Sequence, residues 1–279
     1  MSAIKRRLKS LLQKSAPGLA TQMQIVWQRR HVERLLRRLG LPRLLRAYSA
    51  RYGFVVRSGP FAGMKYAPRA VGSALIPKLV GSYESELHGV LSQILATSYE
   101  IIVDIGCAEG YYAVGLALHV PGARIFAFDI DPLGRRLCRA MARANGVAGR
   151  VAVAGRCDAN TLQARLHDKR RALVVCDCEG CEMDLLQPDR TPALRDADIL
   201  VELHDGVDPA ISRVVPERFA QTHDLILVPA APARDPAQWP DLDFLDAADR
   251  RLAVSELRHG PQQQWAYLTA RSKASDRPA

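Results

Sequence analysis

Five apolar runs of strand length alternate with helical segments between residues 100 and 220. The runs are EIIVDIG (100–106), RIFAFDI (124–130), RVAVAG (150–155), ALVVCD (172–177) and DILVELH (198–204). The predicted helices cover about 110–119, 132–145, 159–168, 181–187 and 209–220. Near-continuous apolar strands that alternate with helices indicate a parallel sheet covered on both faces. With the later runs HDLILVP (223–229) and QQWAYLTA (263–270), the sequence predicts an α/β fold with a doubly wound, mostly parallel, seven-stranded sheet.

The positive charge of the chain is concentrated at its N-terminus. The formal net charge is +10, and residues 1–57 hold fourteen of the 39 Lys and Arg residues but one acid, Glu33. The remaining chain is close to neutral. A basic arm on a neutral body indicates contact with an anionic partner, namely nucleic acid, anionic lipid or an acidic glycan, or else a solvated charged helix face.

Residues 1–50 are expected to form a basic helical extension, with residues 51–279 as the main domain. Two amphipathic helices are predicted, at 3–14 and at about 22–39, and both could lie on an anionic membrane surface. The apolar stripe of the second helix could instead dock on the protein's own core. No apolar run reaches the ~18 residues of a membrane span, and no signal-peptide core follows the basic start. We therefore expect a cytoplasmic protein, with peripheral membrane contact as a further possibility.

A glycine loop follows the first predicted strand in VDIGCAEGYY. Gly106 and Gly110 allow the backbone to turn tightly and approach a ligand, and the next helix presents its N-terminal amides. The spacing is not that of a dinucleotide loop, and Glu109 within it would repel a pyrophosphate. The loop is suited to a cationic ligand.

Acidic residues follow the second and third strands. Asp129 stands where a carboxylate can accept hydrogen bonds from both hydroxyls of a ribose. Asp131 is interpreted as a helix cap before Pro132. For Asp158, two roles stay open: recognition of an adenine amino group, or capping of the next helix.

The segments VDIGCAEG, AFDIDP, GRCDA and VVCDCEGCE together resemble a class I S-adenosylmethionine-dependent methyltransferase. The D-x-E-G-x-E segment, followed by ILVELHD, is similar to the FkbM family, which methylates hydroxyls of sugars and natural products. The resemblance spans roughly residues 80–230. It implies S-adenosylmethionine as cofactor, held by Glu84, Asp104, Gly106, Cys107, Ala108, Glu109, Gly110, Tyr111, Asp129, Ile130, Asp158, Ala159 and Asp177. Tyr83 and Glu84 would close over the cofactor, although Glu84 could equally be a first-turn acid favoured by the helix dipole.

Methyl transfer to a hydroxyl requires a group that takes the hydroxyl proton. His204 is the expected general base, with Asp177 and Glu202 as further catalytic residues. The alternative is a structural histidine bonded to Glu202 or Asp205. We expect no metal among the site residues, although Asp177, His204 and Asp205 could form a divalent site in a metal-assisted variant.

Three cysteines (Cys176, Cys178 and Cys181) interleave with acids in CDCEGCE. A zinc or iron-sulfur site is one interpretation, but Cys176 belongs to a buried strand, so we expect these cysteines to be small buried filler. The acids Glu179 and Glu182 are then expected beside the acceptor pocket.

The expected acceptor is a hydroxyl-bearing small molecule, sugar or glycan, bound by the loops at 52–83 and 229–262. Nucleic acid is disfavoured, since neither an N-P-P-Y type loop nor a P-C dipeptide occurs. An RNA methyltransferase whose basic arm follows phosphates stays the alternative, as does a non-catalytic binding module. We assign no oligomeric state.

Overall fold

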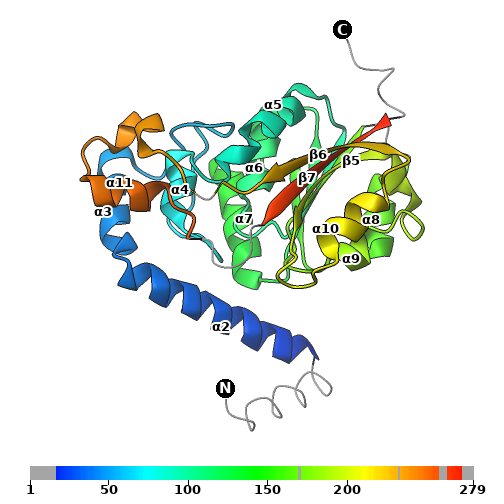
Figure 1. Ribbon diagram of the computed structural model, residues 1–279, viewed down its shortest axis with the longest axis horizontal. Helices are drawn as coiled ribbons and strands as arrows, with labels where there is room; N and C mark the ends of the chain where they lie inside the picture. The colour runs from blue at the N-terminus through cyan, green and yellow to red at the C-terminus, as the bar shows by residue number, and fades with distance from the viewer. Residues whose placement is uncertain (1–16, 169–170, 232, 258–262, 272–279) are drawn as a thin grey trace.

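The computed structural model describes residues 17–168, 171–231, 233–257 and 263–271, and these form a layered α/β structure (Figure 1). Seven strands make one sheet in the order β3-β2-β1-β4-β5-β7-β6. The strands are β1 (Ile101–Ile105), β2 (Arg124–Phe128), β3 (Val151–Ala154), β4 (Ala172–Cys176), β5 (Ala197–Leu203), β6 (His223–Pro229) and β7 (Gln264–Ala270). Only β7 pairs antiparallel with its neighbours, β5 and β6. The predicted doubly wound, mostly parallel, seven-stranded sheet is confirmed.

Helices cover both faces of the sheet. The α-helices are α2 (Pro17–Arg38), α3 (Leu41–Tyr52), α4 (Leu75–Val80), α5 (His88–Ala96), α6 (Tyr111–His119), α7 (Pro132–Ala144), α8 (Ala159–Leu166), α9 (Glu182–Leu185), α10 (Ile211–Glu217) and α11 (Ala247–Val254). Short 3-10 turns are η1 (Ser85–Leu87), η2 (Pro192–Asp196), η3 (Pro236–Gln238) and η4 (Pro240–Leu242). The predicted helices within the sheet region are all present, whereas α3, α4 and α11 were not expected.

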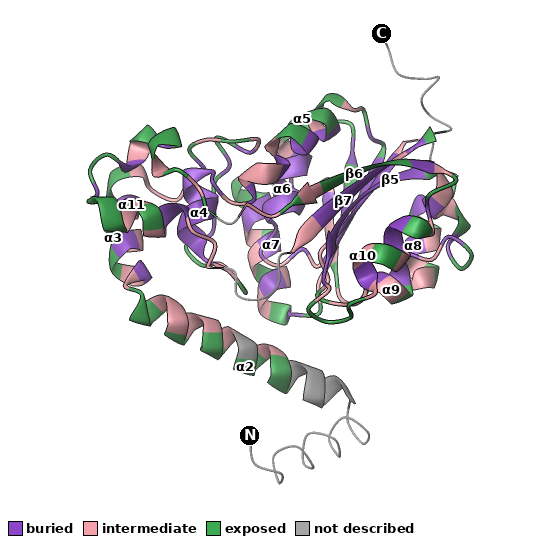
Figure 2. Cartoon of the chain, in the orientation of Figure 1, coloured by how far each residue is buried: buried purple, intermediate pink, exposed green. Residues whose placement is uncertain are grey.

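Two apolar layers hold the sheet between the helices. Ile102 of β1 packs with α4 to α7, and its neighbours Ile101 and Val103 pack on the opposite face with α8 to α10. All five residues of β1 are buried, which is why all but Asp104 are apolar. Figure 2 shows the central strands as the most continuously buried part of the chain.

The N-terminal extension is partly a separate helix and partly core. α2 runs along the lower side of the body in Figure 1 and confirms the second predicted basic helix, although it begins at Pro17. α3 follows at once and buries Leu41, Leu44 and Tyr48. The expected boundary at residue 51 therefore falls inside α3. The helix predicted at 3–14 lies outside the described residues.

No helix in the described ranges combines the length and apolar character that a membrane crossing requires.

Candidate active site

The ends of β1 and β4 meet at Gly106. The Asp177 amide donates to the Ile105 carbonyl over 2.9 Å, which fixes the two strand ends beside each other. Gly106 has φ +90°, and a Cβ added there would lie 1.7 Å from the Asp177 carbonyl oxygen. Only glycine fits this position, because the Asp177 backbone occupies the space that a side chain would need.

Asp129 is held in place at the end of β2. Its Oδ1 accepts from the Asp131 amide over 2.6 Å, and its Oδ2 accepts from the Ala108 amide over 2.7 Å. Ala108 itself has φ +45°, an uncommon conformation for a residue with a side chain. Because a carboxylate has about four acceptor sites, each Asp129 oxygen keeps capacity for a ligand hydroxyl.

Asp131 caps α7, as predicted, because its Oδ1 accepts from the Leu133 amide over 2.9 Å. Its carboxylate also pairs with Arg29 of α2 over 2.6 Å. The basic helix is thus anchored two residues from Asp129.

Asp104 is buried within β1, and its Oδ2 has no hydrogen-bond partner in the described part of the chain. Burial, together with the nearby charge of Asp129, raises the pKa of Asp104 to about 7.

Glu109 does not present its charge to a ligand. It is fully buried, and its Oε1 accepts from Lys78 Nζ and from the Tyr66 hydroxyl, each over 2.6 Å. Its Oε2 accepts from the Val71 amide over 2.9 Å. This differs from the expectation that Glu109 suits a cationic ligand, because Lys78 already balances its charge. The sequence feature that indicated this buried ion pair is Lys78, a single lysine within the apolar run LIPKLV.

Glu84 and Tyr111 lie in the interior beside the glycine loop. Glu84, with φ +48°, accepts a hydrogen bond from the Tyr112 hydroxyl and lies immediately before η1. The Tyr111 ring packs edge-on against Tyr83 and Phe61, with centroids 5.0 and 5.1 Å apart. Glu84 and Tyr111 are both almost fully buried.

The remaining predicted cofactor residues differ in exposure. Cys107 is buried, and Gly110 opens α6 with φ +102°. Ile130 is 47% exposed, so its side chain is available at the surface next to Asp129.

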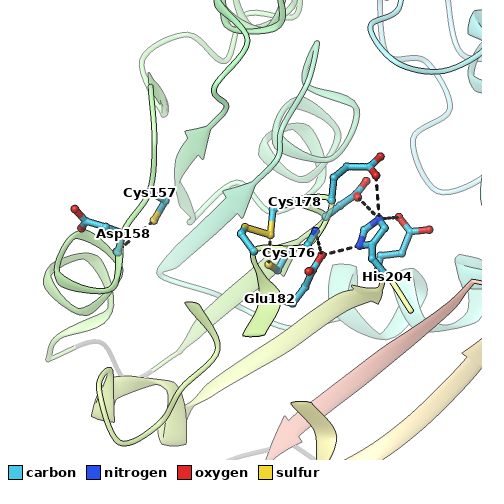
Figure 3. The surroundings of a disulfide bond; sticks show 11 residues. Cys157, Asp158, Cys176, Cys178, Glu182 and His204 are labelled. Atoms are coloured by element: carbon cyan, nitrogen blue, oxygen red, sulfur yellow. Dashed lines mark hydrogen bonds and ion pairs between the residues drawn. A yellow bond between two sulfur atoms is a disulfide. The ribbon is translucent and has the colours of Figure 1, made fainter. Parts of the chain in front are cut away.

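Asp158 is a helix cap. It is exposed, and its Oδ1 accepts from the Thr161 amide over 2.8 Å at the start of α8, directly before Ala159. Hydrogen bonds from Thr161 lower the pKa of Asp158. The capping alternative is therefore the one that the structure shows, and Figure 3 shows Asp158 well separated from His204.

His204, at the end of β5, lies inside a group of four carboxylates (Figure 3). Its Nδ1 lies 2.6 Å from Glu182 Oε1. On the other side of the ring, Nε2 lies 3.5 Å from Asp177 Oδ1, 3.3 Å from Glu202 Oε2 and 3.8 Å from Glu179 Oε2. The three predicted catalytic residues are thus brought together, with Glu179 and Glu182 joining them. We call these five residues the His204 cluster.

The protonation state of His204 is set by these acids. Burial alone would lower its pKa, but the carboxylates of Glu182, Glu202 and Asp177 outweigh it and raise the pKa of His204 to about 11. These contacts favour the protonated ring in the ligand-free protein.

Asp205 is not part of the His204 cluster. Its Oδ1 accepts from the Ser212 amide over 2.8 Å, at the start of α10. Asp205 therefore does not join Asp177 and His204 in the metal-assisted variant that the sequence left open, and Glu179 lies beside these two residues instead.

Cys178 and Cys181 are joined by a disulfide that brackets Glu179 and Gly180. Cys176 is buried, with its Sγ 3.6 Å from that of Cys178. The expectation of three cysteines as simple filler did not include this bond. Its short loop holds Glu179, with φ +57°, beside the imidazole.

A cavity of about 420 Å³ lies between the two loop regions in which the acceptor pocket was predicted. Its lining comes from both regions and from the segment of η1 and the start of α5: Ser58, Gly59, Ser85, Glu86, His88, Ala231, Ala233, Arg234, Asp235, Gln238 and Trp239. Neither Asp129 nor any member of the His204 cluster lines this cavity.

Neither a protein-family model nor a curated protein matches this chain. Several solved methyltransferase structures are similar. A precorrin-6y C5,15-methyltransferase from Geobacter metallireducens is 14% identical, with a TM-score of 0.43 over 65% of this chain and 88% of that one. The O-methyltransferase TomG from Streptomyces achromogenes, in complex with S-adenosylmethionine, is 14% identical with a TM-score of 0.41, covering 66% and 78%. TrmN from Thermus thermophilus is 16% identical with a TM-score of 0.41, covering 67% and 50%. At these TM-scores the similarities assign neither activity nor substrate to this chain, and the fold assignment rests on the strand order.

Proposed function

We propose that this chain is an S-adenosylmethionine-dependent O-methyltransferase of the FkbM type, acting on a hydroxyl of a sugar, glycan or natural product. One observation carries the proposal: three features lie together at the edge of the sheet where the parallel strands end. The Gly106 turn follows β1, the fixed carboxylate of Asp129 follows β2, and the His204 cluster lies at the ends of β4 and β5. Ligands of doubly wound sheets bind at this edge.

In this proposal, Asp129 accepts hydrogen bonds from the two ribose hydroxyls. The Ala108 and Asp131 amides hold the carboxylate in one orientation, so little side-chain freedom is lost on binding. Asp158, which is exposed and occupied as a cap, has no part in holding the adenine.

Methyl transfer from a sulfonium to a hydroxyl forms a C–O bond, breaks the S–C bond and releases the hydroxyl proton. We place the acceptor hydroxyl at the His204 cluster, which receives that proton. From the sequence we expected His204 to be the general base, whereas we now propose that the carboxylates of the cluster and the His204 ring together accept the proton. Positioning and desolvation of the acceptor supply the rest of the rate enhancement.

Calorimetry with S-adenosylhomocysteine tests the cofactor part of the proposal. We expect one molecule bound per chain, with affinity reduced at least tenfold in Asp129→Asn and unchanged in Asp158→Asn. Asp158→Asn is the matched control, since it alters an acid after the neighbouring strand. Absence of binding to the intact protein would overturn the proposal.

Transfer of a labelled methyl group tests the reaction. We expect His204→Ala to retain cofactor affinity and to lose turnover on hydroxyl acceptors. Label found on RNA instead of glycan or small-molecule hydroxyls would show that the alternative acceptor is the right one.

A further inference from the structure

The Nε2 atom of His204 points into a gap between three carboxylates. The side chain is 3% exposed, and Nε2 has no hydrogen-bond partner in the described part of the chain. The separations of 3.3, 3.5 and 3.8 Å from Glu202, Asp177 and Glu179 exceed the ~2.7 to 3.2 Å of N–H···O bonds. A single proton on Nε2 could satisfy only one of these oxygens.

The same separations suit ligands that share one metal ion. Ligand atoms about 2.1 Å from a metal lie roughly 3.0 to 3.4 Å from each other, in octahedral and tetrahedral arrangements respectively. One atom each of Asp177, Glu179 and His204 lie within 4.8 Å of one another. Glu202 Oε2 lies beside this group of three, 3.3 Å from Nε2.

Glu182 supplies the support that a metal-binding histidine needs. It is fully buried, and its Oε1 accepts from Nδ1 over 2.6 Å. A carboxylate on Nδ1 fixes the ring orientation and leaves Nε2 as the ligand atom, an arrangement found around protein metal ions.

From these contacts we propose that Asp177, Glu179, Glu202 and His204 bind one divalent cation. A cation bound there offsets the carboxylate charge and takes the place of the Nε2 proton. One imidazole with carboxylate oxygens favours Mn²⁺ or a similar ion over a thiolate-bound metal.

The site has an open side. Glu179 is 82% exposed and Asp177 is 25% exposed, whereas Glu202 and His204 are almost covered. This leaves a coordination position accessible to a small oxygen ligand. The assignment of this oxygen to the acceptor hydroxyl rests on the proposed function. The binding of the cation does not depend on that function.

Electron paramagnetic resonance of Mn²⁺, titrated into the full chain after treatment with chelator, tests the site directly. We expect one Mn²⁺ per chain. Glu179→Gln, a change at an exposed position, should weaken binding about tenfold, and Glu182→Gln should weaken it by roughly 10- to 100-fold. The matched control is Asp205→Asn, which lies next to His204 in sequence but outside the cluster and should leave Mn²⁺ affinity unchanged.

Three results would overturn the site. The first is absence of binding of Mn²⁺, Zn²⁺ and Mg²⁺ at millimolar concentration. The second is an equal effect of Glu179→Gln and Asp205→Asn. The third is Zn²⁺ binding that is lost in Cys176→Ser yet kept in Glu179→Gln, which would assign the metal to sulfur. Calorimetry with S-adenosylhomocysteine reports on the proposed function separately, so either can fail alone.

Discussion

Asp104 carries an energetic cost that most residues of the sheet do not. It lies in a fully buried strand, next to the negative charge of Asp129, and one of its oxygens has no partner in the described structure. Ionisation of this carboxyl within the fold is therefore unfavourable.

Replacing Asp104 with Asn should stabilise the ligand-free protein in a pH-dependent way. The pKa of Asp104 is about 7 in the fold and 3.8 as the reference value, so the folded state binds the extra proton between these values. Stability contributed by protonated Asp104 is thus present at low pH and is lost as pH rises through 7. Because Asn does not ionise, Asp104→Asn should gain up to about 4 kcal/mol over the wild type at pH 8 and little at pH 4. Urea unfolding at both pH values measures the gain.

Asp158→Asn is the control for this measurement, because hydrogen bonds lower the pKa of that exposed carboxyl. It should show no gain at pH 8. A gain in stability for Asp104→Asn that is equal at both pH values would contradict the assignment of Asp104 as a buried carboxyl with a raised pKa.

The sequence predicted the site where its residues follow strand ends, and failed where partners come from distant segments. Asp177, Glu202 and His204 meet because β4 and β5 are adjacent and parallel, which the apolar runs already indicated. Glu109 was misread because its partner Lys78 comes from α4, and only the tertiary fold brings the two together. Likewise, nothing in the spacing distinguished Glu179 from Asp205 as the neighbour of Nε2.

Among the elements, α3 shows most clearly why the expected boundary of the N-terminal extension, at residue 51, differs from the structure. The G-L-P segment that ends α2 also begins α3: Gly40 adopts φ +79°, and Pro42 falls in the first turn, where proline is tolerated. Leu41, Leu44 and Tyr48 then recur at helical spacing. Because residues 1–57 are so basic, we expected the extension to continue to residue 50, whereas α3 within it packs into the core.

α2 exposes one continuous face that combines apolar and basic side chains. Met23, Val26 and Trp27 are 55%, 40% and 60% exposed, and Arg30 and Arg34 continue the same face at helical spacing. Figure 2 shows exposed residues along α2. We propose that this face lies on an anionic membrane surface, with the apolar side chains at the acyl boundary and the arginines near lipid phosphates.

Sedimentation with vesicles tests this role of α2. Phosphatidylserine-containing vesicles should retain the protein, and neutral vesicles should retain it several-fold less. Substituting both Arg30→Glu and Arg34→Glu should remove most of that retention, since each basic side chain near the surface contributes about 1 kcal/mol. Arg165→Glu combined with Arg213→Glu, at exposed positions on α8 and α10, is the charge-matched control. Equal retention of the two variants would contradict the proposal.

For the whole molecule, α3 joins α4 and α11 in a small layer beside the sheet (Figure 1). This layer carries segments from both ends of the chain, including Leu75 to Val80 and Ala253, into the same apolar core. The predicted sheet region alone therefore does not contain the complete folding unit. The sequence could not show this, because the layer is built from short helices whose apolar residues face one another across about 200 residues of chain.

Two truncations separate the arm from this folding unit. The fragment 41–279 loses α2 and its two ion pairs with the body, Arg29–Asp131 and Glu33–Arg69, and should unfold within about 2 kcal/mol of the full chain because such pairs near the surface contribute about 0 to 1 kcal/mol each. The fragment 53–279 also loses the buried side chains of Leu41, Leu44 and Tyr48, each of which contributes about 1.5 to 3 kcal/mol. Its free energy of unfolding should fall by roughly 5 kcal/mol, a large part of the ~5 to 15 kcal/mol of a typical domain. Leu44→Ala in the full chain should cost about 2 to 5 kcal/mol and provides a comparison without truncation. If 53–279 unfolds at the same denaturant concentration as 41–279, α3 is part of the arm and the boundary lies at residue 51 after all.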